Sequence, residues 1–177
     1  MVKATVRKFG AIHILVNNAA HMKDNKAVLD TTEKEWERSI DVTLKGTFLC
    51  SKHAIPDMIK AGGGSIINIS SVGGLVGFEN YSAYCAAKGG VIQLTKSLAI
   101  DYGRFNIRAN AICPGPIQTG ISPRKGSKLS KHQLEMTVLG RTGSPMEVAS
   151  VALFLASNES SYVTGASLVV DGGWTAR

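Results

Sequence analysis

The sequence is poor in cysteine, in aromatic residues and in long apolar runs. Only 3 of its 177 residues are cysteines, and they lie far apart, as Cys50, Cys85 and Cys113. We therefore expect buried free thiols in a reducing, cytoplasmic setting rather than a disulfide framework or a metal site. No apolar stretch approaches the roughly 18–20 residues of a membrane-spanning helix, so we expect no membrane partner. The N-terminal MVKATVRKFG has a basic start with no apolar segment after it, which argues against a secretory signal.

The charge balance is basic, with a formal net charge of +7. Part of the excess lies in one stretch, at Arg124, Lys125, Lys128 and Lys131. A nucleic-acid-binding surface would interleave such residues with exposed aromatic rings, yet aromatics make up only 6% of the chain. We therefore predict no nucleic-acid partner. The stretch is better explained as a solvated basic loop, or at most as an attraction for an anionic substrate or a cofactor phosphate.

Apolar runs alternate with helix-like segments along the chain, which is typical of parallel β/α units. The length fits one domain with a substantial core. The segment Pro114–Leu129 is rich in Gly, Pro, Ser and Lys and has no period, so it is predicted to be a loop. We expect strands at Ile12–Asn17, Ile66–Ile69, Ile107–Ile112 and Ala166–Val170.

Two helix starts carry clear signals. Thr32 and Glu35 have the spacing of a capping box, and Ser144-Pro145-Met146-Glu147 combines a capping serine, a proline in the first turn and a glutamate three residues after the cap. The first helix should bend at Gly46 and Pro56 and end at Ala61–Gly64, and the second should end near Ala156. Further helices are expected at Ser82–Tyr102 and Lys131–Val138, with apolar inner sides formed by Trp36, Ile40, Leu44 and Phe48 in the first helix and by Val91, Leu94, Leu98 and Ile100 in the Ser82–Tyr102 helix.

The most informative group is a tyrosine, a lysine and a serine. Tyr84 and Lys88 lie four residues apart in SAYCAAKGG, and Ser71 lies upstream at the end of GSIINISS. Residues at i and i+4 share one face of a helix, so the phenol and the ammonium should lie side by side. The ammonium should then lower the pKa of Tyr84 toward neutrality. A phenol tuned in this way can act as a general acid or base, with the serine hydroxyl holding a substrate oxygen against it.

By itself a Tyr/Lys pair at this spacing is more often an ordinary amphipathic turn, and the surrounding motifs give it weight. NNAA follows the first apolar run at Asn17–Ala20, INISS ends the second, ICPGPIQTG occupies Ile112–Gly120, and VTGASLVVDGGW closes the chain. In this order and spacing the motifs resemble the short-chain dehydrogenase/reductase family over essentially the whole chain. The resemblance implies an α/β fold with a partial Rossmann-type doubly wound parallel sheet.

The resemblance also implies hydride transfer between NAD or NADP and a carbon that bears a hydroxyl or carbonyl group. Tyr84 would exchange the oxygen-bound proton, Lys88 would lower the pKa of Tyr84 and hold the nicotinamide ribose, and Ser71 would orient the substrate oxygen. Ser70 is the alternative serine, whereas Tyr81 has a cysteine four residues on and no lysine. The cofactor would be lined by Asn17, Asn18, Ala19, Tyr84, Lys88, Pro114, Gly115, Ile117 and Thr119.

Two positions depart from the family pattern. The family has an asparagine that supports a proton relay in the helix after NNAG, and DVTLKGTF places Thr43 there. A threonine hydroxyl can still donate and accept a hydrogen bond, but it is shorter than an amide. The second change is milder, because Ala20 replaces the glycine of NNAG.

The glycine-rich turn TGxxxGxG, which precedes NNAG in this family, is not found, and Gly10 is the only glycine before Asn17. The resemblance therefore predicts one truncated domain over residues 1–177 that lacks roughly the first 70 residues of the family fold and keeps its strands four to seven. Ile12–Asn17 would then be an exposed edge strand, apolar on both faces and prone to association. The choice between NAD and NADP is left open, because its selector follows the second strand of that half.

Two functions from different classes remain. The first is an oxidoreductase that interconverts a secondary alcohol and a ketone, similar to a 3-oxoacyl reductase or acting on another small carbonyl compound. The second is a non-catalytic remnant or oligomerisation partner that cannot bind the cofactor alone. For both we expect a homo-oligomer, with the helices over Thr32–Ile59 and Ser82–Tyr102 forming the subunit contact that the resemblance implies.

Overall fold

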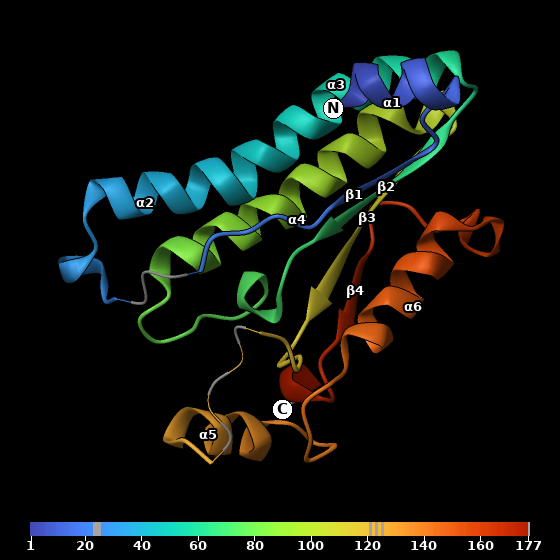
Figure 1. Ribbon diagram of the computed structural model, residues 1–177. Coiled ribbons are helices and arrows are strands. Elements are labelled where there is room, and N and C mark those ends of the chain that lie inside the picture. The colour runs from blue at the N-terminus through green and yellow to red at the C-terminus, as the bar shows by residue number, and fades with distance from the viewer. Residues whose placement is uncertain (23–25, 121, 123, 125, 177) are drawn as a thin grey trace.

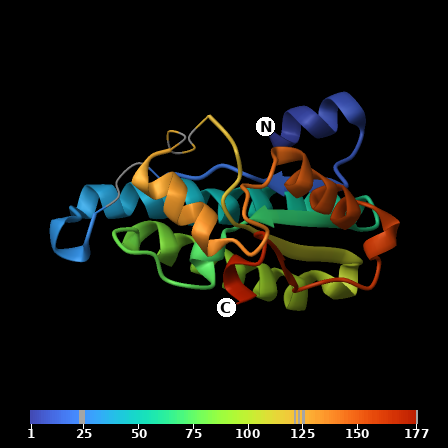
Figure 2. The ribbon, with the colours of Figure 1, turned by 90° about the horizontal axis from the view of Figure 1, so that it is seen from below.

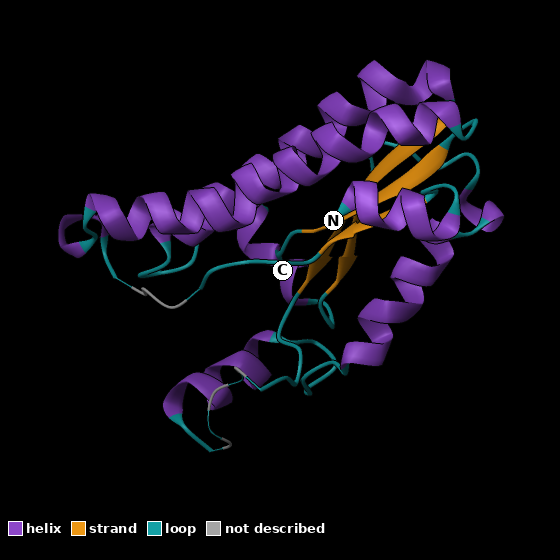
Figure 3. Cartoon of the chain, turned by 45° about the horizontal axis from the view of Figure 1, so that its top comes forward, coloured by secondary structure: helices purple, strands orange, loops and turns teal. Residues whose placement is uncertain are grey.

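The computed structural model describes residues 1–22, 26–120, 122, 124 and 126–176, so Lys125 of the basic stretch lies outside the described residues. The described part forms a four-stranded parallel sheet in the order β1-β2-β3-β4, with helices on both of its faces (Figures 1 and 3). The strands are β1 Ile14–Asn17, β2 Gly64–Ile69, β3 Ile107–Pro114 and β4 Ser167–Val170. The α-helices are α1 Val2–Phe9, α2 Glu33–Ser39, α3 Gly46–Lys60, α4 Ser82–Tyr102, α5 Lys128–Met136 and α6 Pro145–Ala156. Shorter helical segments are η1 Val28–Asp30, the π-helix η2 Ile40–Lys45, η3 Val72–Gly74, η4 Gly103–Phe105, η5 Asn158–Ser160 and η6 Trp174–Ala176.

All three pairs of neighbouring strands in the sheet are parallel, and each pairing has a defined register. Ile14 pairs with Ser65, Gly64 with Ile107, and Ala111 with Ser167, each in parallel. The α/β class and the contiguous parallel sheet predicted from the sequence are therefore confirmed. Because the strands run in the same direction, their carboxyl ends meet at one edge of the sheet, where sites usually form in such folds.

Successive residues of β2 bury opposite faces of the sheet, because side chains alternate along a strand. Ile66 is fully buried in a cluster with Met58 of α3 and Leu98 of α4. Ile67 is equally buried and packs on the other face with Leu155 of α6. These two clusters thus fix the sheet between α3 and α4 on one side and α6 on the other, and a third, smaller cluster joins Ile92 of α4 to β3.

The first strand lies at the edge of the sheet, as predicted, and one of its faces is open. It begins at Ile14, two residues later than expected. Leu15 is buried against the α3 side, whereas Ile14 and Val16 remain 50% and 48% exposed. An apolar edge strand with a free backbone is a recognised site of strand pairing.

The helix that was expected to bend at Gly46 and Pro56 is interrupted elsewhere. Its start is confirmed, since Thr32 and Glu35 form a full capping box. The irregularity is η2, a π-helical stretch that ends before Gly46, and Pro56 lies inside the continuous α3. Such π-helical turns insert an extra residue and re-aim the side chains that follow.

Several predicted inner positions face outward instead. Trp36 and Phe48 are 43% and 44% exposed, and Ile100 of α4 is 81% exposed. A large part of their apolar surface is therefore left uncovered within the described chain. Of the three cysteines, only Cys113 is buried, while Cys50 and Cys85 are partly exposed, which corrects the expectation of three buried thiols.

The later elements differ from the prediction mainly at their ends. The bounds of α4 are those predicted, and α6 begins with the predicted capping box between Ser144 and Glu147. Helix α5 begins at Lys128 rather than Lys131, because the Ser127 hydroxyl caps it by accepting a 3.2 Å hydrogen bond from the Ser130 N–H. Viewed from below in Figure 2, α5 (orange) crosses in front of the blue and cyan helical layer that contains α2. Within the described ranges no helix is both long and apolar enough to cross a membrane.

Candidate functional site

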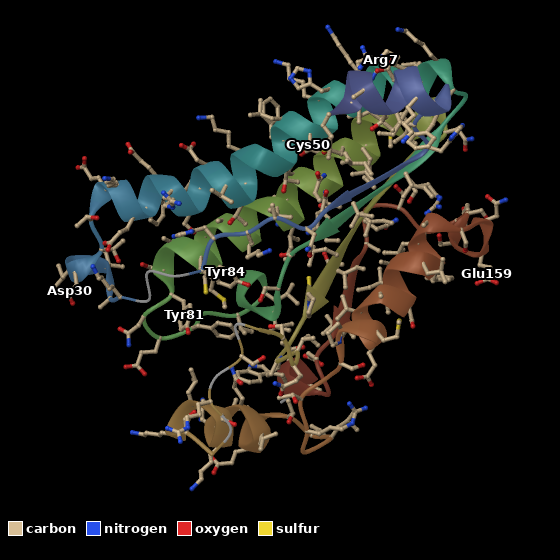
Figure 4. All side chains as sticks on the ribbon, viewed as in Figure 1. Arg7, Asp30, Cys50, Tyr81, Tyr84 and Glu159 are labelled. Carbon is tan, nitrogen blue, oxygen red and sulfur yellow. The ribbon has the colours of Figure 1, made fainter. Side chains whose placement is uncertain are left out.

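The structure brings Ser71 and Tyr84 together at the carboxyl edge of the sheet. Ser71 follows β2, is 7% exposed and caps η3, since its Oγ accepts a 3.0 Å hydrogen bond from the Gly73 N–H. Tyr84 lies in the first turn of α4 (Figure 4). The Ser71 hydroxyl lies close enough to the Tyr84 phenol to lower its pKa. The serine hydroxyl and the tyrosine phenol, which come from two different elements, are therefore neighbours at this edge.

Lys88 lies one turn further along α4 and is almost completely buried, at 2% exposure. Its Nζ is 5.8 Å from the centre of the Tyr84 ring and donates a 2.6 Å hydrogen bond to the Ile69 carbonyl. Burial lowers the pKa of Lys88 from 10.5 to about 8, because the charged form loses its hydration. The ammonium is thus held beside the ring by the end of β2.

The predicted effect of Lys88 on Tyr84 is wrong for the chain as described. The pKa of Tyr84 is raised above its ordinary value of 10.0, chiefly because burial disfavours the phenolate. The nearby Ser71 hydroxyl lowers the pKa but does not reverse the effect of burial. The Lys88 ammonium is engaged by Ile69 and is not among the causes that shift the phenol. Tyr84 is therefore a protonated phenol at neutral pH.

Ser70 has a contact that the sequence did not reveal. Its Oγ donates a 2.8 Å hydrogen bond to the main-chain carbonyl of Lys88, and its exposure is only 2%. The thiol of Cys113 lies beside Ser70; burial raises the pKa of this thiol, and the Ser70 hydroxyl lowers it by a smaller amount. Three consecutive residues at the end of β2 thus contact the site. The Ile69 carbonyl accepts a hydrogen bond from the Lys88 ammonium, the Ser70 hydroxyl binds the Lys88 carbonyl, and the Ser71 hydroxyl lies beside the Tyr84 phenol. The doubled serine of INISS was the only sequence signal for this arrangement.

Thr43 was predicted as a catalytic residue in place of the family asparagine. It lies on the π-helix η2, is 1% exposed, and its Oγ1 accepts a 3.1 Å hydrogen bond from the His21 N–H. Ser39, four residues earlier, donates a longer bond of 3.5 Å to the His21 carbonyl. In the described residues no hydrogen bond joins Thr43 to Tyr84. Thr43 therefore anchors the segment that follows β1 rather than the phenol itself.

Asn17, a predicted cofactor-lining residue, ties the sheet to its helices. Its Nδ2 donates hydrogen bonds of 2.8 Å to Asn68 Oδ1 and of 3.3 Å to Ser51 Oγ. Asn68 in turn donates 2.9 Å to Thr95 Oγ1. The side chain of Asn17 is thus occupied inside the protein, and the exposed residues at this strand end are Asn18 and Ala19.

The second predicted cofactor segment leaves the same edge of the sheet. Pro114 ends β3, and Gly115 packs so closely on Asp171 that an added Cβ would lie 2.8 Å from it. Ile117 pairs with Gly143, and the exposed Thr119 donates its N–H to Ser122 Oγ at 2.7 Å. The segments beginning at Asn18, Ser71 and Pro114 therefore all start from the carboxyl ends of neighbouring strands.

A cavity of about 240 Å³ lies beside the Pro114 segment rather than at the tyrosine. None of Ser71, Tyr84 and Lys88 lines it. Among the described residues no group of three or more His, Cys, Asp or Glu side chains is placed to hold a metal ion. The cavity is lined by residues that include Pro116, Ile117, Arg141, Glu147, Val169 and Val170.

Comparison with known proteins assigns the chain to a family. Residues 1–175 match the family model described as enoyl-(acyl carrier protein) reductase. The chain is 49% identical over 175 residues to trans-4-hydroxycyclohexanecarboxylate dehydrogenase from Sinomonas cyclohexanicum. The chain belongs to the short-chain dehydrogenase/reductase family. The match to the Sinomonas relative covers 99% of this chain and 65% of that protein's length.

Two further members of the family match this chain over a similar share of its length. A 3-oxoacyl-(acyl-carrier-protein) reductase from Thermotoga maritima is 44% identical over 98% of this chain and 70% of its own length. The crystal structure of a putative short-chain alcohol dehydrogenase from Sinorhizobium meliloti 1021 superposes with a TM-score of 0.93 at 33% identity, over 99% of this chain and 70% of that one. The family fold predicted from the motifs is therefore confirmed.

Proposed function

We propose that this chain carries the catalytic centre of an NAD(P)-dependent oxidoreductase that interconverts a secondary alcohol and a ketone. The observation that carries the proposal is the meeting of Ser71, Tyr84 and Lys88 at the carboxyl edge of the sheet. The relatives support the reaction class, since one is named for a hydroxyl-bearing substrate and another for an oxo-bearing one. The substrate is then a small carbonyl or alcohol compound, and the setting is cytoplasmic.

In this proposal each side chain has one task. Ser71 donates its hydroxyl to the substrate oxygen and holds it against the phenol of Tyr84, which gives or takes the proton. Lys88 supplies a buried positive charge beside the ring and carries N–H donors for the cofactor ribose. The bound nicotinamide supplies or accepts the hydride. Thr43 acts by fixing the segment at His21, which follows the proposed cofactor residues.

The residues at the carboxyl edge suit a dinucleotide in one respect. Asn18 and Ala19 after β1, and Thr119 after β3, are exposed at the same edge from which Ser71 leaves β2. The remaining predicted cofactor residues support the backbone of these segments; they are Asn17, Pro114, Gly115 and Ile117. We propose that they contact NAD or NADP together with Tyr84 and Lys88.

The raised pKa of Tyr84 has a consequence for direction. A phenol that holds its proton at neutral pH is ready to protonate an oxygen, which is the step required when a ketone is reduced. Oxidation of an alcohol needs the phenolate, which burial disfavours. We therefore expect the reductive direction to be the faster one at neutral pH, with oxidation gaining as pH rises.

The proposal is tested by cofactor binding and turnover measured side by side. The purified chain is titrated with NADH and NADPH while cofactor fluorescence is followed, and ketone reduction is assayed with the same samples. Tyr84→Phe should keep cofactor binding and lose turnover, whereas Tyr81→Phe, which removes a neighbouring phenol, should keep both. Turnover that survives Tyr84→Phe would overturn the assignment.

A second candidate is an oligomerisation partner without catalysis of its own. It is favoured by the large exposed apolar residues on one helical layer, where Trp36 and Phe48 are 43% and 44% exposed, and by the open edge of β1. We propose that these helices, over Thr32–Ile59 and Ser82–Tyr102, join copies of the chain in a homo-oligomer. Absence of NADH and NADPH binding, together with a stable dimer in light scattering, would favour this candidate over the enzyme.

A further inference from the structure

Aromatic side chains form a continuous row that begins at Tyr84. The ring centres of Tyr84 and Tyr81 are 6.2 Å apart, those of Tyr81 and Phe78 are 6.0 Å apart, and those of Phe78 and Trp174 are 5.8 Å apart. His132 of α5 ends the row, 6.3 Å from Trp174. We call these five residues the aromatic row. Figure 4 shows its first two members, Tyr84 and Tyr81, at the start of α4 above α5.

The position of Trp174 is set by the turn that precedes it. The carboxylate of Asp171 accepts hydrogen bonds from the Gly173 N–H at 2.8 Å and from the N–H and hydroxyl of Thr175 at 2.8 and 2.7 Å. Gly173 has a φ of 85°, and an added Cβ would lie 2.7 Å from Val138. The C-terminal turn is therefore stabilised by its own hydrogen bonds and by close packing against the segment after α5. Together these contacts fix the position of the Trp174 indole.

The other end of the row is fixed by the serine turn. A Cβ added to Gly73 would lie 3.0 Å from Phe78 Cε2 and 3.3 Å from Tyr84 Cε1. Any side chain at this position would press on both rings. Gly73 is also the residue whose N–H bonds to Ser71 Oγ. The same turn that places the serine therefore places the first rings of the row beside it.

The row is not part of the interior. Phe78, Tyr81, Tyr84 and Trp174 are half-buried and His132 is exposed, and none of them belongs to the buried clusters that hold the sheet. Aromatic residues are only 6% of the chain, yet five rings, the imidazole included, come from three separate segments and form one row that begins at Tyr84. Such rings offer flat apolar faces against which an apolar ring can bury its surface.

We propose that the aromatic row is the surface that selects the substrate, and that it favours a secondary alcohol or ketone whose reacting carbon belongs to a six-membered carbon ring. This rests on the proposed function, because it takes Tyr84 as the residue that meets the substrate oxygen. A ring lies against Tyr81, Phe78 and Trp174 without freezing rotatable bonds, whereas an open chain of the same size loses that freedom on binding.

The test uses the fact that the chain has only two tryptophans. In a Trp36→Phe variant, Trp174 is the sole indole, and its emission reports on the row. Cyclohexanol and hexan-2-ol, which have the same number of carbons, are titrated with NAD or NADP present. We expect a saturable change in emission with cyclohexanol, at a Kd on the order of tenfold below that for hexan-2-ol. The reverse variant, Trp174→Phe with Trp36 retained, should show no change.

Two further variants link the preference to the row. Phe78→Leu and, separately, Tyr81→Leu in the Trp36→Phe background should narrow the difference between the two alcohols several-fold while circular dichroism stays unchanged. Equal Kd values for the two alcohols, no saturable change with cyclohexanol, or a preference that survives both variants would overturn the inference. Turnover measured in parallel separates this inference from the proposed function. Ring-selective binding without oxidation would support the role of the aromatic row and contradict the oxidoreductase activity. Oxidation of both alcohols without selective binding would support the activity and contradict the role of the row.

Discussion

The Ser70 hydroxyl donates a 2.8 Å hydrogen bond to the main-chain carbonyl of Lys88, and both residues are 2% exposed. The approach is so close that a Cβ on Gly74 would lie 2.8 Å from the same carbonyl oxygen. Lys88 is thus hydrogen-bonded twice to the end of β2, through its main-chain carbonyl to Ser70 and through its ammonium to Ile69. The end of β2 and the second turn of α4 therefore behave as one unit around the candidate site.

Ser70→Ala should remove the hydrogen bond to the main-chain carbonyl of Lys88. We expect it to destabilise the fold by about 1–3 kcal/mol, because it deletes a buried hydrogen bond and leaves a gap beside Cys113. The matched control is Ser150→Ala, which deletes a 2.9 Å bond from a serine hydroxyl to the Met146 carbonyl on the surface of α6 and should change stability by less than about 0.5 kcal/mol. Denaturant unfolding measures both, and equal losses would contradict the structural role given to Ser70.

Thr43 offers a test at a single amide. Thr43→Val keeps the shape of the side chain but cannot accept the hydrogen bond from the His21 N–H, whereas Thr43→Ser can. Hydrogen exchange at the His21 amide should accelerate in the valine variant and stay slow in the serine variant. If both variants leave the amide equally protected, the segment after β1 is held by something other than the Thr43 hydroxyl.

The sequence predicted best what local chemistry decides. Both capping boxes gave correct helix starts, because the serine or threonine and the glutamate that form them are three residues apart. The parallel sheet followed from alternating apolar runs. The outward position of Ile100 did not, because no periodic pattern states which side of a helix a neighbouring layer will cover.

The chemistry of the site was harder to predict, since it depends on burial. Spacing correctly put Lys88 beside the Tyr84 ring, but the pKa of the phenol is governed by lost hydration and by where the ammonium is directed. The partner of Thr43 depends on the π-helical turn of η2, and the role of Ser70 depends on how α4 crosses the end of β2. These are relations between elements, which a single sequence does not encode at any fixed spacing.

Adjacent glycines in α4 should respond oppositely to alanine. A Cβ at Gly90 would lie 2.6 Å from Leu44 Cδ2, whereas at Gly89 its nearest neighbour, the Gly74 carbonyl oxygen, is an ordinary 3.6 Å away. Gly89→Ala should stabilise the helix by roughly 0.5–1 kcal/mol, because alanine loses less backbone freedom on folding. Gly90→Ala should destabilise it by crowding the contact with η2.

Leu44→Val supplies the check on that contact. Combined with Gly90→Ala, it should recover part of the lost stability, so that the two changes together cost less than their sum. Strict additivity in thermal or denaturant unfolding would show that Leu44 and Gly90 do not meet.

Lys88 should leave a signature in the pH dependence of stability. Burial lowers its pKa to about 8 in the folded chain, against 10.5 when it is unperturbed. Between these values the unfolded chain binds more protons than the folded chain, so this residue makes the free energy of unfolding rise with pH across that window, by as much as about 3 kcal/mol. Lys88→Met should remove the rise, and Lys96→Met, on an exposed position of the same helix, should retain it. Because the lost bond to Ile69 shifts the whole curve equally, the informative quantity is the slope: parallel curves for wild type and Lys88→Met would mean that the buried amine titrates normally.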